Sequence, residues 1–182
     1  VGIWIRDSYS VANVGDGICV EGNVTGCYLD TLELSANTAN GIEFINVSGS
    51  VPSDFFCSKI VSDSNGQNGY LIPLGMNQSY FYGCWGSNRG SGRNFSCQGT
   101  SISIIGGFFF NCNGNGLDII GGQKNMVSGV TVQDAGINSA NTYDGIYINT
   151  TDVIVDSCFV FTNSSKTRYG INLGSSSSNI TI

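Results

Sequence analysis

Short runs of alternating apolar and polar residues recur along the whole chain, and they are built around one repeated unit. The unit is a glycine followed by an apolar residue, a variable residue and a second apolar residue. It occurs at residues 2–5, 17–20, 41–44, 69–72, 116–119, 145–148 and 170–173, with a degenerate copy at 94–97. From Gly17 to Gly170 the copies are on average about 25 residues apart. A constant period of this length, with two-residue alternation and no helical periodicity, predicts a solenoid made of β-strands.

The residue before the glycine is often Asn or Asp, as at Asp16, Asn40, Asn68, Asn115 and Asp144. Both residue types tolerate left-handed backbone angles and glycine adopts them freely, so we expect the pairs to turn corners in that conformation. Such a pair usually joins the two strands of a hairpin. Here the repeat keeps one direction and one period, which favours parallel coils. The fold class we expect is all-β: a parallel β-helix solenoid of about seven coils of roughly 25 residues, with three short strands in each coil.

The Asn/Asp-Gly-Ile-x-Ile units, together with following runs such as residues 152–158, resemble the right-handed parallel β-helices of the pectate-lyase-like superfamily. The style of the coils is most similar to that of viral (phage) tailspike proteins. The resemblance covers nearly the whole chain, except for the short first coil between Gly2 and Gly17. It implies a right-handed coil. The chain length and the absence of a linker or composition break predict a single β-helix domain over residues 1–182. The resemblance does not imply one activity, because this fold carries lyases, hydrolases, epimerases and inert adhesins.

The composition fits a solenoid that is rich in turns. The chain has 26 glycines, 11% charged residues and 41% hydrophobic residues, many of them in strict alternation, which argues against disorder. It opens on a strand without Met and stops inside a strand signal at residues 179–182, and neither end shows the cap that a solenoid needs. We therefore expect a fragment of a longer chain.

Charge and hydropathy argue against several partners. A net charge of −6 without a basic stripe argues against nucleic acid. No segment approaches the roughly 20 apolar residues of a membrane span, so no membrane insertion is expected. The sequence has no histidine and no CxxC pair, so neither a metal site nor a cofactor is expected.

The seven cysteines are expected to be buried free thiols, because their number is odd and no paired spacing emerges. Free thiols favour a reducing compartment, such as the cytosol in which a virion assembles. A similar point of successive coils is occupied by small residues, namely Cys27, Cys57, Cys84, Gly107, Gly129 and Cys158. Asn-x-Ser/Thr sequons favour the opposite environment, a glycosylated secreted chain, although their excess over chance is small. The sequons start at Asn23, Asn46, Asn77, Asn94, Asn149, Asn163 and Asn179.

Side chains in a strand alternate, so the variable residue of each unit is expected to point outward. Stacking the coils then gives one outward column of Trp4, Cys19, Glu43, Leu71, Ser96, Asp118, Tyr147 and Asn172. A second column, two residues further along each strand, contains Arg6, Glu21, Ile45, Pro73, Gln98, Ile120, Asn149 and Gly174. Neighbouring residues of one column are expected about 4.8 Å apart.

Glu21 and Glu43 are the candidate catalytic residues, because on adjacent coils their carboxyl groups would lie roughly 5–9 Å apart, the range used in glycoside hydrolysis. Asp118 would lie about 14 Å beyond Glu43, too far to join them. Two solvated glutamates are the alternative explanation. Related hydrolases use a compact aspartate cluster, and related lyases an aspartate calcium site with a nearby Arg or Lys; neither pattern is intact here. Without histidine as a general base, catalysis wholly within this segment is not supported.

The candidate carbohydrate-binding residues are Trp4, Asp118, Tyr147, Asn149 and Asn172. An aromatic ring face stacks on a sugar ring while neighbouring amides bond its hydroxyls, and Tyr147 has two asparagines beside it. A lone surface aromatic or a subunit contact is the alternative for each ring.

Other apolar residues are assigned to the core or to an interface. Two of the three phenylalanines at 108–110 are expected in the core and one outside, and Trp85 is expected in the core. The resemblance to tailspikes implies a homotrimer. Apolar residues in the outward columns indicate an interface on the solenoid; they are Trp4, Ile45, Leu71 and Ile120.

Three functions remain open. The first, which the resemblance favours, is a tailspike or fibre segment on a virion surface (tail), or otherwise extracellular. It would bind polysaccharide on a host cell, with depolymerase activity carried by the full spike or by a groove between subunits. The second is a stand-alone pectate-lyase-like polysaccharide lyase or glycoside hydrolase, for which Glu21 and Glu43 are the evidence. The third is a structural cell-surface adhesin or fibre spacer.

Overall fold

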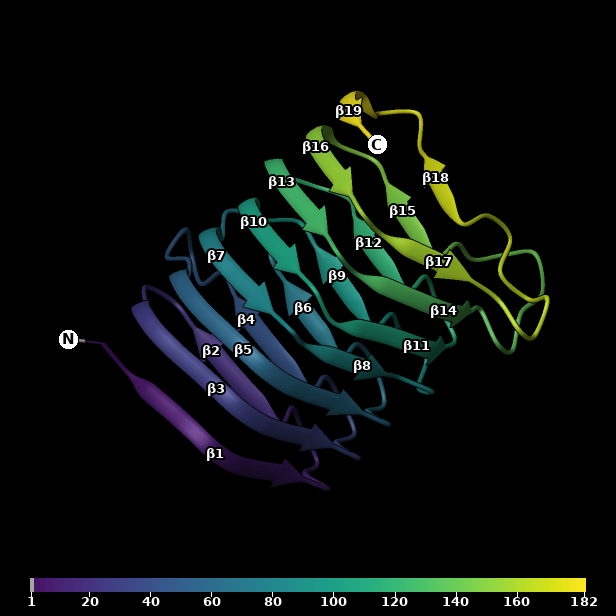
Figure 1. The fold of residues 1–182 in the computed structure, drawn as a ribbon. Coiled ribbons are helices and arrows are strands. Elements are labelled where there is room, and N and C mark those ends of the chain that lie inside the picture. Colours follow the sequence, from purple (N-terminus) through teal and green to yellow (C-terminus); the bar gives the residue numbers. More distant parts are fainter. Residues whose placement is uncertain (1) are drawn as a thin grey trace.

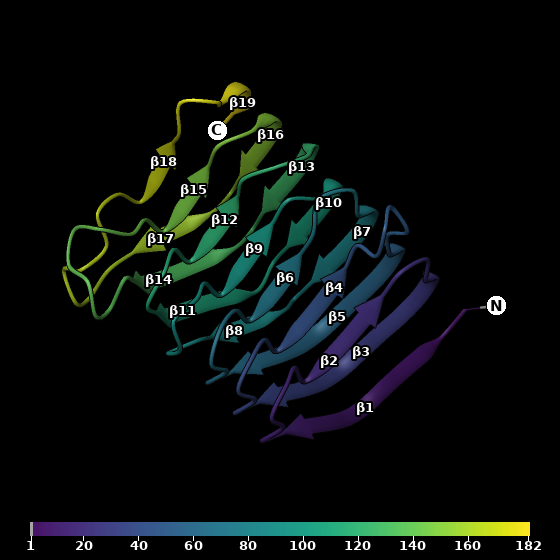
Figure 2. The same ribbon diagram turned by 180° about the vertical axis from the view of Figure 1, so that it is seen from behind.

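The computed structural model describes residues 2–182, which form β-strands and no helix, and hence none that could span a membrane. The strands wind into a parallel β-solenoid of about seven turns with a spacing of about 24 residues (Figure 1). Figure 2 shows the coils from behind, with the two ends of the chain at opposite ends of the solenoid. The all-β solenoid predicted from the repeat is therefore confirmed.

One side of the solenoid, which we call face A, is a seven-stranded parallel sheet in which each strand pairs with the next copy of the repeated unit. Because the strands contain the glycine units, the sequence repeat and the sheet register coincide. The strands are β2 (Ile18–Glu21), β4 (Ile42–Ile45), β6 (Tyr70–Ile72), β9 (Phe95–Cys97), β12 (Leu117–Ile119), β15 (Ile146–Ile148) and β18 (Ile171–Leu173).

A twelve-stranded sheet wraps around the other two sides, faces B and C. Face B contains β7 (Asn77–Tyr82), β10 (Thr100–Ile105), β13 (Gln123–Ser128), β16 (Thr151–Asp156) and β19 (Ser178–Thr181). Face C contains β8 (Trp85–Ser87), β11 (Phe108–Cys112), β14 (Thr131–Ala135) and β17 (Phe159–Phe161). The long strands β1 (Trp4–Val11), β3 (Thr25–Ser35) and β5 (Ser53–Asp63) bend across both faces, and β5 pairs with β7 and then with β8. Three short strands per coil are thus found from β6 to β17, whereas the first coils fuse two of the three.

The corner between faces B and C is turned by one left-handed residue in each coil. These residues stack in register, and they are Asp7, Thr31, Lys59, Gly83, Gly106, Gly129 and Ser157. Only glycine takes this conformation without a Cβ penalty, so the other four residues are sterically strained at the corner.

The repeated glycines before face A do not turn corners in the predicted way. None of Gly17, Gly41, Gly69, Gly116 and Gly145 has a positive φ, and neither have the Asn or Asp residues before them. A Cβ on each of these glycines would lie 2.5–2.6 Å from a backbone carbonyl oxygen of the next coil. The expectation of left-handed angles was wrong; glycine is needed because the backbones of successive coils approach too closely for a side chain.

Asn94 replaces glycine in one coil, and the core makes room for it. Its side chain accepts a hydrogen bond from the Asn88 backbone N–H at 2.7 Å and donates one to the Phe110 carbonyl at 3.0 Å. On the neighbouring strand β8, Gly86 occupies the inward position, where a Cβ would lie 3.2 Å from that of Asn94. A small residue on face C thus compensates for a larger one at the corner.

Asparagine side chains hold the coils at their spacing. Asn40 Nδ2 donates to Asp16 Oδ1 and Asn68 Nδ2 donates to Asn40 Oδ1, each at 3.0 Å. In a parallel ladder, Asn37 Nδ2 donates to Asn65 Oδ1 at 2.9 Å. The same side-chain oxygens of Asp16, Asn40 and Asn65 also accept hydrogen bonds from backbone N–H groups of neighbouring coils, so they satisfy buried backbone donors at this corner.

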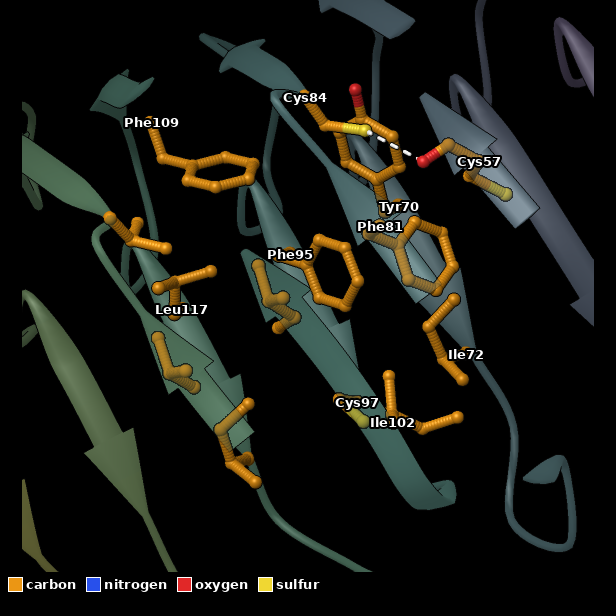
Figure 3. Packing of buried hydrophobic residues seen from close by; sticks show 14 of the residues in the cluster. Cys57, Tyr70, Ile72, Phe81, Cys84, Phe95, Cys97, Ile102, Phe109 and Leu117 are labelled. Carbon is orange, nitrogen blue, oxygen red and sulfur yellow. Dashed lines mark hydrogen bonds between the residues drawn. The ribbon is translucent and has the colours of Figure 1, made fainter. Parts of the chain in front are cut away.

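The core is a column of aromatic and aliphatic side chains between the three faces (Figure 3). Phe81 lies edge-on to Phe95 with ring centroids 4.9 Å apart, and Tyr70 stacks on Phe95 at 5.2 Å. Tyr70 is fully buried, and its hydroxyl donates to the Ile60 carbonyl at 2.6 Å. The hydroxyl is therefore not left without a partner in the core.

Several assignments to the core were wrong by one residue. Phe109 alone of the three phenylalanines at 108–110 is buried, because Phe108 and Phe110 point out of face C, and Trp85 points out beside them. The cysteines do not share one column either, since Leu29, not Cys27, pairs with Cys57. After a left-handed corner, the first residue of a short strand can point either into the core or toward solvent. The alternation of apolar and polar residues alone does not determine which.

Candidate functional site

The outward column of face A is as predicted from its second member onward. Strand register aligns Cys19, Glu43, Leu71, Ser96, Asp118, Tyr147 and Asn172. Two residues further along, Glu21 aligns with Ile45. Face A therefore brings Asp118, Tyr147 and Asn172 together on three successive coils, β12, β15 and β18.

Trp4 and Arg6 are not on face A, and their predicted placement was wrong. Strand β1 pairs with β3, so Trp4 lies opposite Tyr28 on face B and Arg6 lies opposite Asp30. The short first coil breaks the period, and the Gly2 unit therefore belongs to a different sheet from the other units.

Trp4 begins an aromatic ladder on face B. Its ring stacks on Tyr28 at 4.1 Å, Tyr28 stacks on Phe56 at 5.0 Å, and Phe56 stacks on Tyr80 at 5.4 Å. The planes differ by 13° or less, so the inner rings cover each other's faces and present edges to solvent. Trp4 is 65% exposed, and its role in sugar binding stays a prediction.

Glu43 lies in an acidic group at the start of face A. Asn40 Nδ2 donates to Glu43 Oε2 and to Asp16 Oδ1, both at 3.0 Å. Burial, a hydrogen bond with Asp16 and the charge of Asp16 raise the pKa of Glu43. Burial, followed by the charges of Glu21 and Asp16, raises the pKa of Cys19 to about 11. Glu43 therefore interacts more directly with Asp16 than with Glu21. In the sequence, Asp16 stood out only as the residue before Gly17.

The other end of face A contains a groove of about 420 Å³, which we call the Asp144 groove. It is lined among others by Asn115, Tyr143, Asp144, Tyr147, Arg168 and Asn172. These residues come from face A strands β15 and β18 and from the loops that lead into β12, β15 and β18. Two residues predicted to bind sugar, Tyr147 and Asn172, are among them.

An ion pair between the buried Asp144 and the partly exposed Arg168 lies in the Asp144 groove. Arg168 Nε donates to Asp144 Oδ1 at 2.9 Å and Arg168 Nη2 donates to Asp144 Oδ2 at 2.8 Å. Asn172 Nδ2 donates to the same Oδ2 at 2.8 Å, and the Asp144 backbone N–H donates to Asn115 Oδ1 at 2.7 Å. The Asp144 carboxylate is fully buried, whereas the Arg168 side chain is 38% exposed. The guanidinium therefore lies at the surface with its charge compensated from below.

A second Arg–Asp pair lies one coil earlier, with its aspartate in strand β12 and not in a loop. The Arg93 Nε group is in contact with Asp118 Oδ2, and Asn115 Nδ2 donates to Asp118 Oδ1. Asp118 is 1% exposed, and its burial raises its pKa while the Arg93 guanidinium acts against that rise. Asp118 is therefore part of a buried pair and reaches a ligand only through Arg93.

Tyr147 and Asn149 lie beside Gly174 at the rim of the groove. A Cβ at Gly174 would lie 2.6 Å from the Tyr147 hydroxyl and 2.4 Å from Asn149 Oδ1. Asn149 Oδ1 accepts a hydrogen bond from the Ser176 backbone N–H at 2.9 Å, so this amide orders the loop. Glycine at position 174 leaves space for the two polar groups.

Sequence reasoning missed Asp144, Arg168 and Arg93. Asp144 was assigned to a corner because it precedes a glycine, and the two arginines lie in loops of irregular length. A signal was present, since each arginine comes about one period after or before the aspartate that it contacts. Within residues 2–182 no three His, Cys, Asp or Glu side chains are arranged to hold a metal ion.

Comparison with known proteins finds likeness in structure only. No protein-family model matches the sequence, and no curated protein matches it significantly. The full-length tailspike protein 2 of an Escherichia coli O157:H7 bacteriophage matches with a TM-score of 0.64 and 12% identity, over 96% of this chain and 37% of that one. The enzymatically active domain of bacteriophage CBA120 tailspike protein 2 matches with a TM-score of 0.64 and 15% identity, over 88% and 26%.

A bacterial enzyme also has this fold. The A-module of the Azotobacter vinelandii mannuronan C-5 epimerase AlgE4 matches with a TM-score of 0.69 and 14% identity, over 97% of this chain and 57% of that one. The chain thus spans less than two thirds of each of these structures. The predicted resemblance is confirmed at the level of the fold: the chain is a parallel β-solenoid like those of phage tailspikes and a pectate-lyase-like epimerase.

Proposed function

We propose that this chain is a polysaccharide-binding β-solenoid and that a glycan lies along face A, with the Asp144 groove as its main site. One observation carries the proposal: the groove combines an aromatic side chain, an amide and an exposed, already oriented guanidinium. A ring stacks on the apolar face of a sugar, and the polar groups bond its hydroxyls. Sites of this kind combine apolar surface with a few fixed polar groups.

The finer proposal is that the chain is part of a homotrimeric virion tailspike that binds polysaccharide on a host cell. The likeness in fold to two tailspike structures supports it. Exposed aromatic residues on the solenoid sides, including Trp4 and Phe159, support a packed assembly. Sedimentation of the full protein as a monomer would contradict the trimer and leave glycan binding untouched.

Binding can be tested on an array of bacterial and algal polysaccharides. We expect Tyr147→Ala and Asn172→Ala each to weaken binding of the captured glycan by about tenfold, equivalent to about 1.4 kcal/mol. Tyr82→Ala, an exposed tyrosine on face B, is the matched control and should bind like the wild type. Equal binding by all four proteins would show that the groove is not the site.

A second candidate function, glycan cleavage, is favoured by the raised pKa of Glu43 beside Asp16. A carboxyl group that retains its proton near a second carboxylate can act as a general acid. We would follow new reducing or unsaturated ends in any glycan that binds. Cleavage that survives both Glu43→Gln and Glu21→Gln would remove this cluster from consideration.

A further inference from the structure

We infer that the Asp144 groove takes an uncharged glycan and disfavours polyuronates; this inference rests on the proposed function. Two cations, Arg93 and Arg168, lie beside face A, and each contacts a buried aspartate. A ligand carboxylate could reach the outer N–H groups of Arg168, but Asp144 already balances the guanidinium charge through two parallel hydrogen bonds, so a full ion pair with the ligand would require exchange with Asp144. Displacing the arginine would leave the aspartate buried without a counter-charge, so the exchange is unfavourable.

Among the residues that the structure describes, the remainder of face A contains no replacement cation. Its outward column, from Cys19 to Asn172, contains neither Lys nor Arg. Arg6 was the one basic residue predicted in the second column, and it lies on face B instead. At the far end, Asp16 and Glu21 add negative charge along the same face. A polyanion that follows the solenoid axis would pass from the two Arg–Asp pairs to carboxylates that have no neighbouring cation among the described residues of face A. These carboxylates would repel it.

The groups left free in the groove suit hydroxyls. Arg168 has N–H donors beyond the two that bond Asp144, and the Asn172 amide uses its nitrogen on Asp144 while its oxygen can accept. The Tyr147 hydroxyl can donate or accept, and it lies beside Gly174, which has no side chain to displace it. Such mixed donors and acceptors fit neutral sugar hydroxyls, which are both donors and acceptors.

The experiment compares wild type, Asp144→Asn and Asn172→Arg for binding to polymannuronate and polygalacturonate, and to a panel of neutral bacterial polysaccharides. Asp144→Asn removes the counter-charge of Arg168, and Asn172→Arg adds a cation at the surface of the groove and does not depend on a buried substitution. We expect wild type to bind a neutral glycan and to bind both polyuronates only weakly. Each variant should gain polyuronate binding by about tenfold at an ionic strength of about 0.01 M and lose that gain at about 1 M.

Binding of a polyuronate by the wild type as tightly as a neutral glycan, with loss in Asn172→Ala, would overturn the inference and leave the proposed function intact. Folded variants that gain nothing would overturn the electrostatic argument. If the wild type binds neither class of polymer, the proposed function itself fails. Thermal melting followed by circular dichroism establishes that each variant is folded.

Discussion

Replacing Gly145 by alanine tests why the repeated glycines are needed. A Cβ at this position would lie 2.6 Å from the Gly170 carbonyl oxygen and 2.2 Å from Val160 Cγ1. The carbonyl belongs to the backbone of the next coil and cannot rotate away, so the two coils must move apart. Overpacking costs about 1–3 kcal/mol, and the lower entropy of the unfolded chain offsets about 0.4–1 kcal/mol of that cost. We expect Gly145→Ala to lower the free energy of unfolding by about 1–2 kcal/mol.

Urea unfolding followed by circular dichroism measures this loss, and two other glycines separate its causes. A Cβ at Gly15 would have no atom within 4 Å, and Gly15 has no positive φ, so Gly15→Ala should be neutral or more stable by up to about 1 kcal/mol. Gly22 is equally open but has a φ of 74°, so Gly22→Ala should cost about 1–2 kcal/mol for conformation alone. A Gly145→Ala protein as stable as wild type would refute the close-approach argument.

Three further expectations follow from buried groups. Ile146→Ala should lower the free energy of unfolding by about 2–5 kcal/mol and Tyr147→Ala by far less, because only Ile146 is fully buried; equal losses would mean that the register of face A is wrong. Asn65→Ala should cost about 1–3 kcal/mol in thermal unfolding, since Asn37 loses an acceptor inside the protein. Although burial acts to raise the pKa of Asp134, hydrogen bonds from Gln133, Ser164 and Thr162 lower it from 3.8 to about 2. The resulting stability, at most about 2 kcal/mol, is present above about pH 4 and lost as the pH falls toward 2; Asp134→Asn should abolish this part of the acid sensitivity.

The repeat was sufficient to predict the coils and the outward column of face A, because a period near 25 residues and a two-residue alternation leave one way to stack the units. The same reasoning failed where the chain bends. Two of the three phenylalanines at 108–110 were assigned to the core, where only Phe109 lies, because strand parity cannot be followed through the left-handed Gly106. Trp4 was placed on the wrong face because its unit obeys the motif but not the period.

The candidate site was predicted only where it lies on strands. Tyr147 and Asn172 follow from strand alternation, and both line the groove. Arg168 comes from a loop whose path depends on its partner Asp144, and no local pattern gives that path. The role of the repeated glycines was also misassigned. Glycine is required both where two coils approach closely and where a turn is left-handed, so the residue type alone does not distinguish the two cases.

Asp144 is bonded to Asn115 in the coil before it and to Arg168 and Asn172 in the coil after it. In a solenoid each repeat contacts only its neighbours, so the molecule behaves as a one-dimensional chain of linked units. A residue that joins three successive units raises the coupling between them at that point. A sugar chain bound there would contact the three coils at once and oppose their separate local unfolding. Hydrogen exchange in β12, β15 and β18 should then slow together, as one cooperative unit.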